Sequence, residues 1–462
     1  MTSSTGWTNQ ADRDRGARIE HVVETSRDAR VEFVHLQFID IPGAIKGLTV
    51  PVNRLVSCLT DGMWFDGSSV EGLARVAESD LYLLPDPDTF AIATWEGSTT
   101  ARLVCNLVTP GNEPFPADPR FVLARALADA AELGFSYRVG AEVEFFLFED
   151  QGSAGRPLDR ARASITLRPS DARSYFELPD ERAAALCQTA VKILRGLGYH
   201  ASATHHEAAP GQHEIDLDAD DAPRTADAIV TLKLVIRSLA HRSGLLPTFM
   251  PKPIETASGS GLHLGQEVLD RATGQNALVT SGGGSQLSPI GQHFVAGQLA
   301  HARGMCAILA PLVNSYKRLL GGDEAPANVS WGRVNRGALL RVSEAPGLAD
   351  AVLEARAPDP SCNPYLALAV LLQAGLDGVR EETPLPSPDE QPPRPGPTVG
   401  EAGDPLPSTL GEAIEELGWD MVVRSALGQP VFERFMAAKE REWLAYRHHI
   451  SSWELESYLE TA

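Results

Sequence analysis

The chain has 462 residues, of which 43% are apolar and 22% charged, and its formal net charge at pH 7 is −21. That composition is typical of a globular protein with an ample core, and the length suggests two or three domains. The negative charge argues against nucleic acid or an anionic membrane as a partner. We expect a cytoplasmic protein with reduced thiols, because the polar start lacks a signal-peptide core, no apolar run reaches transmembrane length, and five scattered cysteines lack CxxC spacing.

The first 112 residues predict a tail and a small domain of short strands. Residues 1–16 are polar and are expected to form a mobile tail, followed by a short helix at 19–25. Positions 34–38 alternate between apolar and polar side chains, which predicts a strand. The turn Ile41-Pro42-Gly43 leads into a second strand near Leu48 and Val50. More short strands are expected up to about residue 107, so residues 17–112 form the predicted N-terminal domain.

Residues 113–462 predict a larger domain that mixes helices and strands, which makes the fold class α+β. Asp118 is expected to cap a helix that has Pro119 at its first position and Gly134 after its end. Further helices are expected at 181–197, 224–242, 289–309 and 364–377. Residues 383–407 are rich in proline and predict an exposed loop. Thr409 with Glu412 then opens a helical C-terminal segment.

Five carboxylates and one imidazole stand in short, distinctive segments of this larger domain. The segments are AEVEFF, HHEAAPGQHEID, GSGLH and LEARAPDP, and the six residues are Glu142, Glu144, Glu207, Glu214, His263 and Glu354. Such a donor set suits hard divalent cations such as Mg²⁺ or Mn²⁺ better than a structural zinc. Two carboxylate-held metals are what an enzyme needs to steady the phosphates of a nucleotide, so ATP-driven chemistry is the leading hypothesis.

The spacing of these residues is compatible with one site. Glu142 and Glu144 are two apart in a strand-like run, so they should share one sheet face. Glu207 and Glu214 flank Ala209-Pro210-Gly211-Gln212, which predicts a type II turn and a hairpin that brings the two carboxylates together. A single such pair is commonly a solvated strand edge. The whole set is not explained in that way, because isolated acids in apolar strands are costly unless they are paired or ligate a metal.

Taken with these segments, the chain resembles the glutamine synthetase family of bacterial type I. Further matching segments occur in the family's order along nearly the whole chain: FDGSS (65–69), AESD (77–80), FMPKP (249–253), NSYKRL (314–319), EAP (324–326), NRGALLR (335–341) and PDPSCNPYL (358–366). The resemblance implies a small N-terminal β-grasp domain followed by a catalytic domain. It also implies a homo-oligomer, a dodecamer of two six-membered rings with each active site between neighbouring subunits.

The chemistry that the resemblance implies has two steps. ATP phosphorylates the γ-carboxylate of glutamate, and ammonia or an amine then displaces phosphate. The first step needs charge neutralisation by metals and arginines, and the second needs a base and a pocket that excludes water. Two or more Mg²⁺ (or Mn²⁺) ions per active site are implied, with ATP as co-substrate.

The resemblance assigns roles residue by residue. Glu144, Glu207 and Glu214 match one metal-binding set, and Glu142, His263 and Glu354 match the other. The implied substrate-binding residues are Gly259, Arg318 for the α-carboxylate of glutamate, Arg341, and Tyr175 near the ammonium site. The implied catalytic residues are Arg336 and Arg356 around the phosphates, Asp66 from the adjacent subunit as the group that deprotonates ammonium, and Glu324 as the flap residue that shields the intermediate.

The chain also departs from the family pattern near the expected nucleotide. Ser258 stands where the family has an Asn, Gly265 where it has a second His, and Glu267 where it has a Ser. Val352 and Ala349 replace basic residues, and the 383–407 loop contains no Tyr for adenylylation. These departures favour an ATP-dependent γ-glutamyl ligase that uses a small organic amine, such as a polyamine, ethanolamine or an alkylamine. Two alternatives stay open: a glutamine synthetase proper that uses ammonia, and a catalytically weakened regulatory assembly protein.

Overall fold

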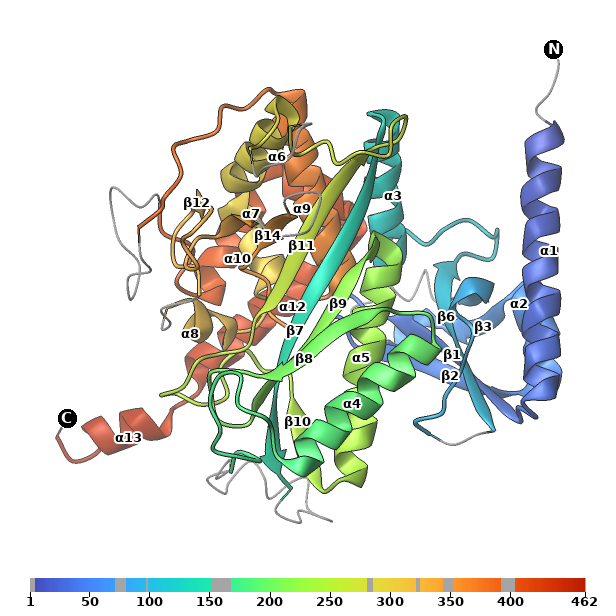
Figure 1. The fold of residues 1–462 in the computed structure, drawn as a ribbon, viewed down its shortest axis with the longest axis horizontal. Helices are drawn as coiled ribbons and strands as arrows, with labels where there is room; N and C mark the ends of the chain where they lie inside the picture. The colour runs from blue at the N-terminus through green and yellow to red at the C-terminus, as the bar shows by residue number, and fades with distance from the viewer. Residues whose placement is uncertain are drawn as a thin grey trace.

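The computed structural model describes residues 5–70, 80–96, 99–150, 168–280, 286–320, 325–343, 352–391 and 404–461. Figure 1 shows a small N-terminal sheet with helix α1 beside a larger unit built around a long, twisted sheet. Both helices and sheets are present, and the α+β prediction is confirmed. No helix among the described residues is both long and apolar enough to cross a bilayer.

The N-terminal unit is a six-stranded sheet with one long helix packed beside it. Its strands are β1 (Phe33–Ile39), β2 (Ile45–Pro51), β3 (Met63–Asp66), β4 (Asp80–Pro85), β5 (Ala91–Ile92) and β6 (Thr100–Val108), and its helices are α1 (Thr5–Asp28) and α2 (Leu55–Asp61). The order is β2-β1-β6-β4-β3, with β5 on β6. The central pair β1 and β6 is parallel, whereas the other pairs are antiparallel.

Helix α1 begins at Thr5, well before the short helix predicted at 19–25. The helix covers most of the segment for which a mobile tail was predicted (1–16), residues 1–4 lie outside the described part, and the tail stays a prediction. The segment has few apolar side chains, so its periodicity was too weak to indicate a helix. Contacts with the domain hold it instead: Val22 is buried, and the Arg15 side chain donates a hydrogen bond of 3.0 Å to the backbone oxygen of Leu59.

The larger unit is an eight-stranded sheet in the order β12-β13-β14-β11-β7-β9-β8, with β10 on β7. Its strands are β7 (Phe135–Glu149), β8 (Ala201–His206), β9 (Gln212–Asp221), β10 (Leu245–Thr248), β11 (Leu262–Asp270), β12 (Trp331–Gly332), β13 (Leu340–Ser343) and β14 (Val352–Ala355). The helices are α3 (Pro119–Glu132), α4 (Glu181–Gly196), α5 (Ala222–Arg242), α6 (Pro289–Ala300), α7 (Ala302–Leu309), α8 (Ser315–Leu319), α9 (Pro364–Arg380), α10 (Leu410–Trp419), α11 (Met421–Leu427), α12 (Gln429–His448) and α13 (Ser452–Tyr458).

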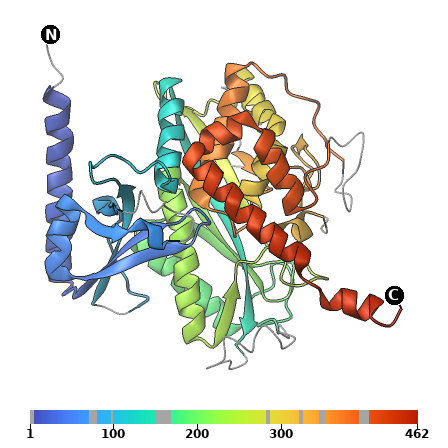
Figure 2. The same cartoon turned by 180° about the vertical axis from the view of Figure 1, so that it is seen from behind.

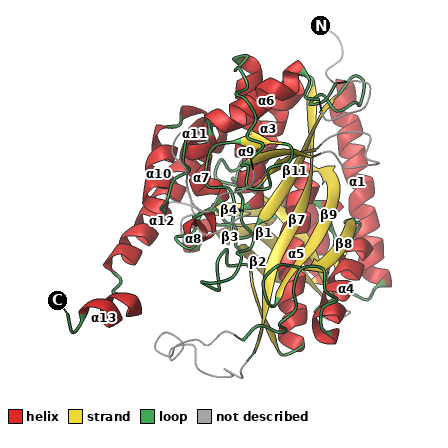
Figure 3. Cartoon of the chain, turned by 60° about the vertical axis from the view of Figure 1, so that its left-hand side comes forward, coloured by secondary structure: helices red, strands yellow, loops and turns green. Residues whose placement is uncertain are grey.

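Helices cover one face of this sheet and leave part of the other for the site. Helix α5 packs on β7, β9 and β10, α3 packs on β7, and α9 packs against both helices. Figure 3 shows α6 to α12 gathered beside the strands, and Figure 2 shows α12 running across the back of the molecule. Asn363 links the two units, because its side-chain amide donates to the backbone oxygens of Asp40 (3.0 Å) and Ile41 (3.2 Å).

Helix ends were predicted well wherever a local cap decides them. The Asp118 carboxylate accepts from the backbone N–H of Arg120 at 3.0 Å, and Gly134 follows the helix with φ of +85°. Ser288 likewise caps α6. Thr409 caps α10, although the Glu412 side chain bonds Ser408 and not Thr409, so the reciprocal bond of a capping box is absent there.

The helix predicted at 289–309 is two helices, α6 and α7, that meet at His301. His301 leaves the helical conformation (φ −100°, ψ 6°), and its ring bonds Asp420 at 2.8 Å and Asp377 at 3.1 Å. Both acids are distant in sequence, so local periodicity could not reveal the break. In the Pro-rich segment, residues 383–391 are mostly exposed as predicted, and 392–403 lie outside the described residues. We keep 17–112 and 113–462 as proposed domain limits.

Candidate functional site

The carboxylates of Glu142 and Glu144 lie on one face of β7, in the middle of the large sheet. Val143 between them is fully buried in the core, as period-two alternation requires. The neighbouring strands place His263 of β11 directly opposite Glu142, and Glu214 of β9 directly opposite Glu144. Sheet register therefore gathers groups from three strands that are far apart in sequence.

The β8–β9 hairpin brings Glu207 next to Glu214, as the turn sequence predicted. Gln212 donates its backbone N–H to the oxygen of Ala209 (3.0 Å), and Gly211 has φ of +70°. A positive φ at the third turn residue, after a proline, is what a type II turn requires. A Cβ at Gly211 would also lie 2.8 Å from the backbone oxygen of Leu147, so glycine is needed there for space as well.

One group of possible metal ligands comprises Glu142, His263 and Glu354. The Nδ1 atom of His263 lies 3.0 Å from a carboxylate oxygen of Glu142 and 3.6 Å from one of Glu354. Burial, and then the charge of Arg356, lower the pKa of His263, so the ring is neutral and offers a lone pair. The predicted second set is thus brought together.

The other group differs in part from the predicted set of Glu144, Glu207 and Glu214. Glu214 lies with His205 and Asp216, their ligand atoms all within 4.8 Å of one another, and His205 Nδ1 is 3.5 Å from Glu207. His205 and Asp216 were not assigned any role from the sequence. Asp216 could have been found, because it stands two residues after Glu214 on the same strand face.

These buried carboxylates repel one another when no cation is bound. Glu144, Glu207 and Glu214 are each less than a tenth exposed. Burial raises the pKa of Glu144 and of Glu214, and the charges of neighbouring glutamates raise both further. A bound divalent cation would offset both effects, and oxygen donors are what Mg²⁺ and Mn²⁺ prefer. The residues therefore fit the metals that the sequence predicted.

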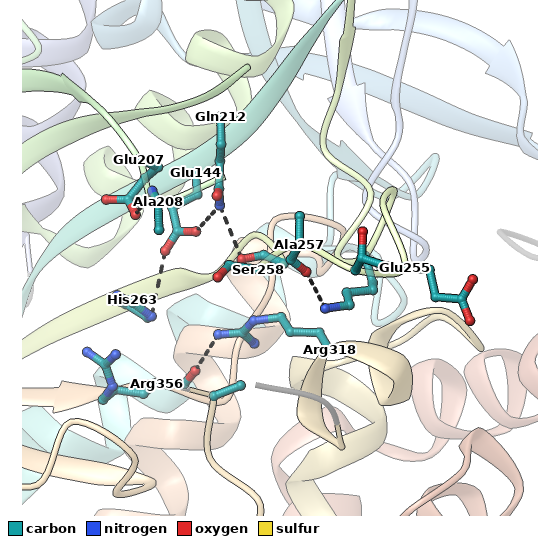
Figure 4. A pocket seen from close by; sticks show the side chains of 14 residues that line it. Glu144, Glu207, Ala208, Gln212, Glu255, Ala257, Ser258, His263, Arg318 and Arg356 are labelled. Atoms are coloured by element: carbon teal, nitrogen blue, oxygen red, sulfur yellow. Dashed lines mark hydrogen bonds and ion pairs between the residues drawn. The ribbon is translucent and has the colours of Figure 1, made fainter. Parts of the chain in front are cut away.

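A cavity of about 390 Å³ is lined by the carboxylates of Glu144 and Glu207. Figure 4 shows Glu144, Glu207 and His263 on one wall, with the guanidinium groups of Arg318 and Arg356 facing them. A site with acidic cation ligands on one side and buried guanidinium groups on the other suits a phosphate ester bound through a metal.

The arginines are held by specific partners. Arg318 donates to the backbone oxygens of Arg356 (2.9 Å), Ala357 (3.0 Å) and Pro358 (3.2 Å). Arg341 lies opposite Glu354 on paired strands and contacts its carboxylate at 3.1 Å, and Arg356 pairs with the same carboxylate. Glu354 thus faces His263 on one side and two guanidinium groups on the other, which fixes its orientation.

Gly259 lines the cavity at a position where only glycine fits. A Cβ there would lie 2.3 Å from the backbone oxygen of Pro251 and 3.1 Å from the Arg318 side chain. Sequence reasoning missed Gln212, whose side-chain amide donates to Glu144 at 2.8 Å and to the oxygen of Gly259 at 3.1 Å. It also gave no role to Lys252 of FMPKP, which lines the same cavity.

Asp66, Arg336 and Tyr175 are predicted site residues that do not line the cavity of this single chain. Asp66 lies on β3 of the small sheet, where its carboxylate accepts from Ser68 and Ser69. Arg336 is exposed, and Tyr175 is 44% exposed against the rings of Phe176 and His205. Glu324 lies outside the described residues. Their roles stay predictions.

The departures near the expected nucleotide have structural consequences. Gly265 lies against Val352, because a Cβ built on Gly265 would be 2.9 Å from a Val352 methyl group. The carboxylate of Glu267 pairs with Arg138 at 3.2 Å. The charge of Glu267 is therefore partly neutralised. Ser258 is exposed at the cavity.

Two family models match the chain, one after the other, over most of its length. The glutamine synthetase β-grasp domain matches residues 30–110, and the glutamine synthetase catalytic domain matches residues 116–458.

Among curated proteins, the glutamine synthetase of Halobacterium salinarum is 40% identical over 449 residues, covering 93% of this chain and 94% of that protein. The glutamine synthetases of Clostridium saccharobutylicum and Thermus thermophilus are each 41% identical, covering 95% of this chain and 98% of theirs. Among solved structures, a GmaS/ADP complex aligns with a TM-score of 0.82 at 29% identity, covering 95% of this chain and 99% of that one. Apo GmaS without ligand aligns with a TM-score of 0.81 at 30% identity.

Proposed function

The chain belongs to the glutamine synthetase family of ATP-dependent ligases, and we propose that it joins the γ-carboxylate of glutamate to a small organic amine. The observation that carries the ligase chemistry is the cavity in which Glu144, Glu207 and His263 face Arg318 and Arg356. A solved relative that is described as an ADP complex supports nucleotide binding.

We assign the first step, phosphoryl transfer, to the acidic and basic walls acting together. Divalent cations held by the two ligand groups would neutralise the phosphates and polarise the transferred group. Arg356 and Arg341 are already fixed by Glu354, so they can offer N–H donors to the developing charge without reorganising. Arg318 is placed to receive the α-carboxylate of glutamate, with its guanidinium held by three backbone oxygens.

The second step needs an acceptor amine that has lost a proton. Asp66 is the proposed base, reaching the cavity of a neighbouring subunit, and its position outside the cavity of its own chain fits that role. This requires an oligomer, and we propose the dodecamer of two hexameric rings. Exposed apolar side chains at the C-terminal end support an interface: Ile450 is 66%, Trp453 62% and Leu459 74% exposed.

An organic acceptor is supported by the walls of the cavity and by the departures from the family pattern. Ala208, Ala257 and Ala325 present small apolar side chains to the cavity, against which an alkyl group can be buried. The Ser258 to Glu267 loop and the absence of a Tyr at 383–407 are also unlike a regulated enzyme of central nitrogen assimilation. Burying one methylene-sized group is worth about 1–3 kcal/mol, or about 10- to 200-fold in kcat/KM.

The second candidate is a glutamine synthetase proper, which the names of the 40%-identical relatives favour. Phosphate release with glutamate, ATP and Mg²⁺ decides between the two, with kcat/KM measured for ammonia, ethylamine, ethanolamine, putrescine and spermidine. We expect at least one amine to exceed ammonia by about tenfold or more. The Glu144→Gln variant supplies the background rate. Ammonia outperforming every amine would establish the second candidate, and no turnover with any acceptor would indicate the regulatory alternative.

A further inference from the structure

A second cluster of ligating side chains lies on the opposite side of the β8–β9 hairpin from the cavity. His206 and His213 are paired across the two strands, and each follows or precedes a cavity-facing residue, so alternation turns both toward the core. Asp171 completes the group, and one ligand atom from each of the three residues lies within 4.8 Å of the others. Both rings are fully buried, and the Asp171 side chain is only 6% exposed.

Both ring nitrogens of His206 face oxygen atoms that accept hydrogen bonds. Its Nδ1 lies 2.7 Å from the backbone oxygen of Glu207, which can only accept, so Nδ1 carries a proton. Its Nε2 lies 2.7 Å from Asp171 Oδ1, which as a carboxylate also only accepts. Either a second proton or a metal ion must therefore stand between Nε2 and the carboxylate.

The surroundings of His213 favour a metal ion over a second proton. Neither of its ring nitrogens has a hydrogen-bond partner, although the ring is fully buried beside His206 and Phe145. Leaving a buried polar atom unsatisfied costs about 1–3 kcal/mol. The second oxygen of Asp171 is also buried without a partner. A proton on His206 would satisfy neither His213 nor this oxygen, whereas a metal ion can bind both.

We propose that Asp171, His206 and His213 bind a late first-row divalent cation, Zn²⁺ foremost, at a site separate from the carboxylate-rich metal site of the cavity. Two imidazoles with one carboxylate are a typical zinc ligand set. Their nitrogen donors favour Zn²⁺ over Mg²⁺, which prefers oxygen. The Nδ1–H of His206 bonded to a backbone carbonyl is the outer-shell contact that orients a metal-binding histidine.

The site would hold the hairpin that carries Glu207 of the cavity and Glu214 of the neighbouring ligand group. Asp171 Oδ1 also accepts from the backbone N–H of Gly211 in the turn (3.3 Å), and His206 bonds the backbone oxygen of Glu207. Metal bound here therefore positions the turn from behind, with no contact to the substrate. Its existence does not depend on which acceptor the enzyme uses.

The test begins with the full-length oligomer stripped of metal by a chelator, then loaded with one equivalent of Zn²⁺ in the presence of excess Mg²⁺. Excess Mg²⁺ competes for the oxygen donors, and because His263 and His205 also offer nitrogen donors, the position of the retained Zn²⁺ decides the test. Metal content per chain and Zn²⁺ affinity by competition with a chromophoric chelator are measured. Diffraction at the zinc absorption edge locates the ion in the wild-type protein, which needs no variant to fold.

We expect one retained Zn²⁺ per chain, with its anomalous peak between Asp171, His206 and His213. His213→Gln and Asp171→Asn should each weaken Zn²⁺ binding by more than about 100-fold. Glu144→Gln and the control His200→Gln, which changes an exposed histidine just before β8, should not weaken it. No retained Zn²⁺, a peak at the cavity glutamates, or unchanged affinity in a folded His213→Gln protein would each overturn the proposal. A loss of ligase activity alone would not count in its favour.

Discussion

Replacing Glu144 with Gln should stabilise the metal-free protein and at the same time remove its response to Mg²⁺. Glu144 is 6% exposed and directly opposite the equally buried Glu214. Burial is the main cause of the raised pKa of both groups, and neighbouring carboxylates add to it. A Gln at this position keeps an oxygen for the Gln212 amide, which now donates to Glu144 at 2.8 Å, and removes the repelling charge.

The size of the effect follows from the register of the two strands. Directly opposed residues have Cβ atoms about 5 Å apart, and two unit charges at that distance repel by about 3 kcal/mol at an effective dielectric constant near 20. Partial protonation at pH 7 relieves some of this repulsion. We therefore expect the variant to gain about 1–3 kcal/mol without metal. Wild type should instead gain about 2.7 kcal/mol when Mg²⁺ reaches 100 times its Kd, and the variant should lose most of that gain.

Thermal unfolding at a fixed protein concentration, first in a chelator and then at rising Mg²⁺, tests both the stability gain without metal and the lost response to Mg²⁺. The Tm of Glu144→Gln should exceed that of wild type in the chelator, and this difference should shrink or reverse at saturating Mg²⁺, where turnover of the variant should be lost. Glu255→Gln makes the same charge change at an exposed position of the cavity and should do neither. A variant less stable than wild type in the chelator, or one that Mg²⁺ still stabilises fully, would refute the assignment of Glu144 as a cation ligand.

Two further substitutions test the basic wall and a buried cap. Arg356→Lys should lower kcat about 100-fold with little change in Tm, since Lys cannot supply a planar fork to phosphate. Arg333→Lys, at a partly exposed position paired with Glu390 and outside the cavity lining, should leave kcat unchanged; equal phosphate release in the two variants would exclude Arg356 from the site. Burial raises the pKa of Asp118 to about 6, against backbone hydrogen bonds that lower it. The unfolding free energy should therefore fall by about 3 kcal/mol as the pH rises from about 4 through 6, because the folded state holds the proton more tightly. Urea unfolding at several pH values should show that fall in wild type and in the exposed control Asp61→Asn, but not in Asp118→Asn; an equal fall in all three would contradict the cause.

Local rules predicted the parts of the site that local geometry decides. Alternation placed Glu142 and Glu144 on one strand face, and Pro210-Gly211 gave the turn that joins Glu207 to Glu214. Capping placed both ends of α3 and the start of α6. The break at His301 and the full length of α1 were missed, because both depend on contacts with residues remote in sequence.

The pairing of charges around the cavity could not be predicted either, because it depends on the register between strands that are remote in sequence. Glu267 departs from the family pattern, and the register of β11 with β7 sets Arg138 opposite it so that the two side chains pair. His205 joins Glu214 and Asp216 only once β8 and β9 are paired. Asp66 and Arg336 could not be tested in the same way, because the roles predicted for them concern groups that a single chain lacks.

The β8–β9 hairpin shows why two kinds of metal ligand can coexist a few ångströms apart. Alternation puts His205 and Glu214 on the face of the hairpin that carries Glu207, and His206 and His213 on the opposite, core face, so the two sets of possible ligands face away from each other. Register keeps the sets apart, because a slip of one residue in β9 would turn His213 away from the core and Glu214 toward it. The tight turn at Gly211, whose φ is +70° and whose backbone N–H donates to Asp171 at 3.3 Å, favours the observed register. The residue that closes the buried cluster therefore also secures the register on which the cavity glutamates depend.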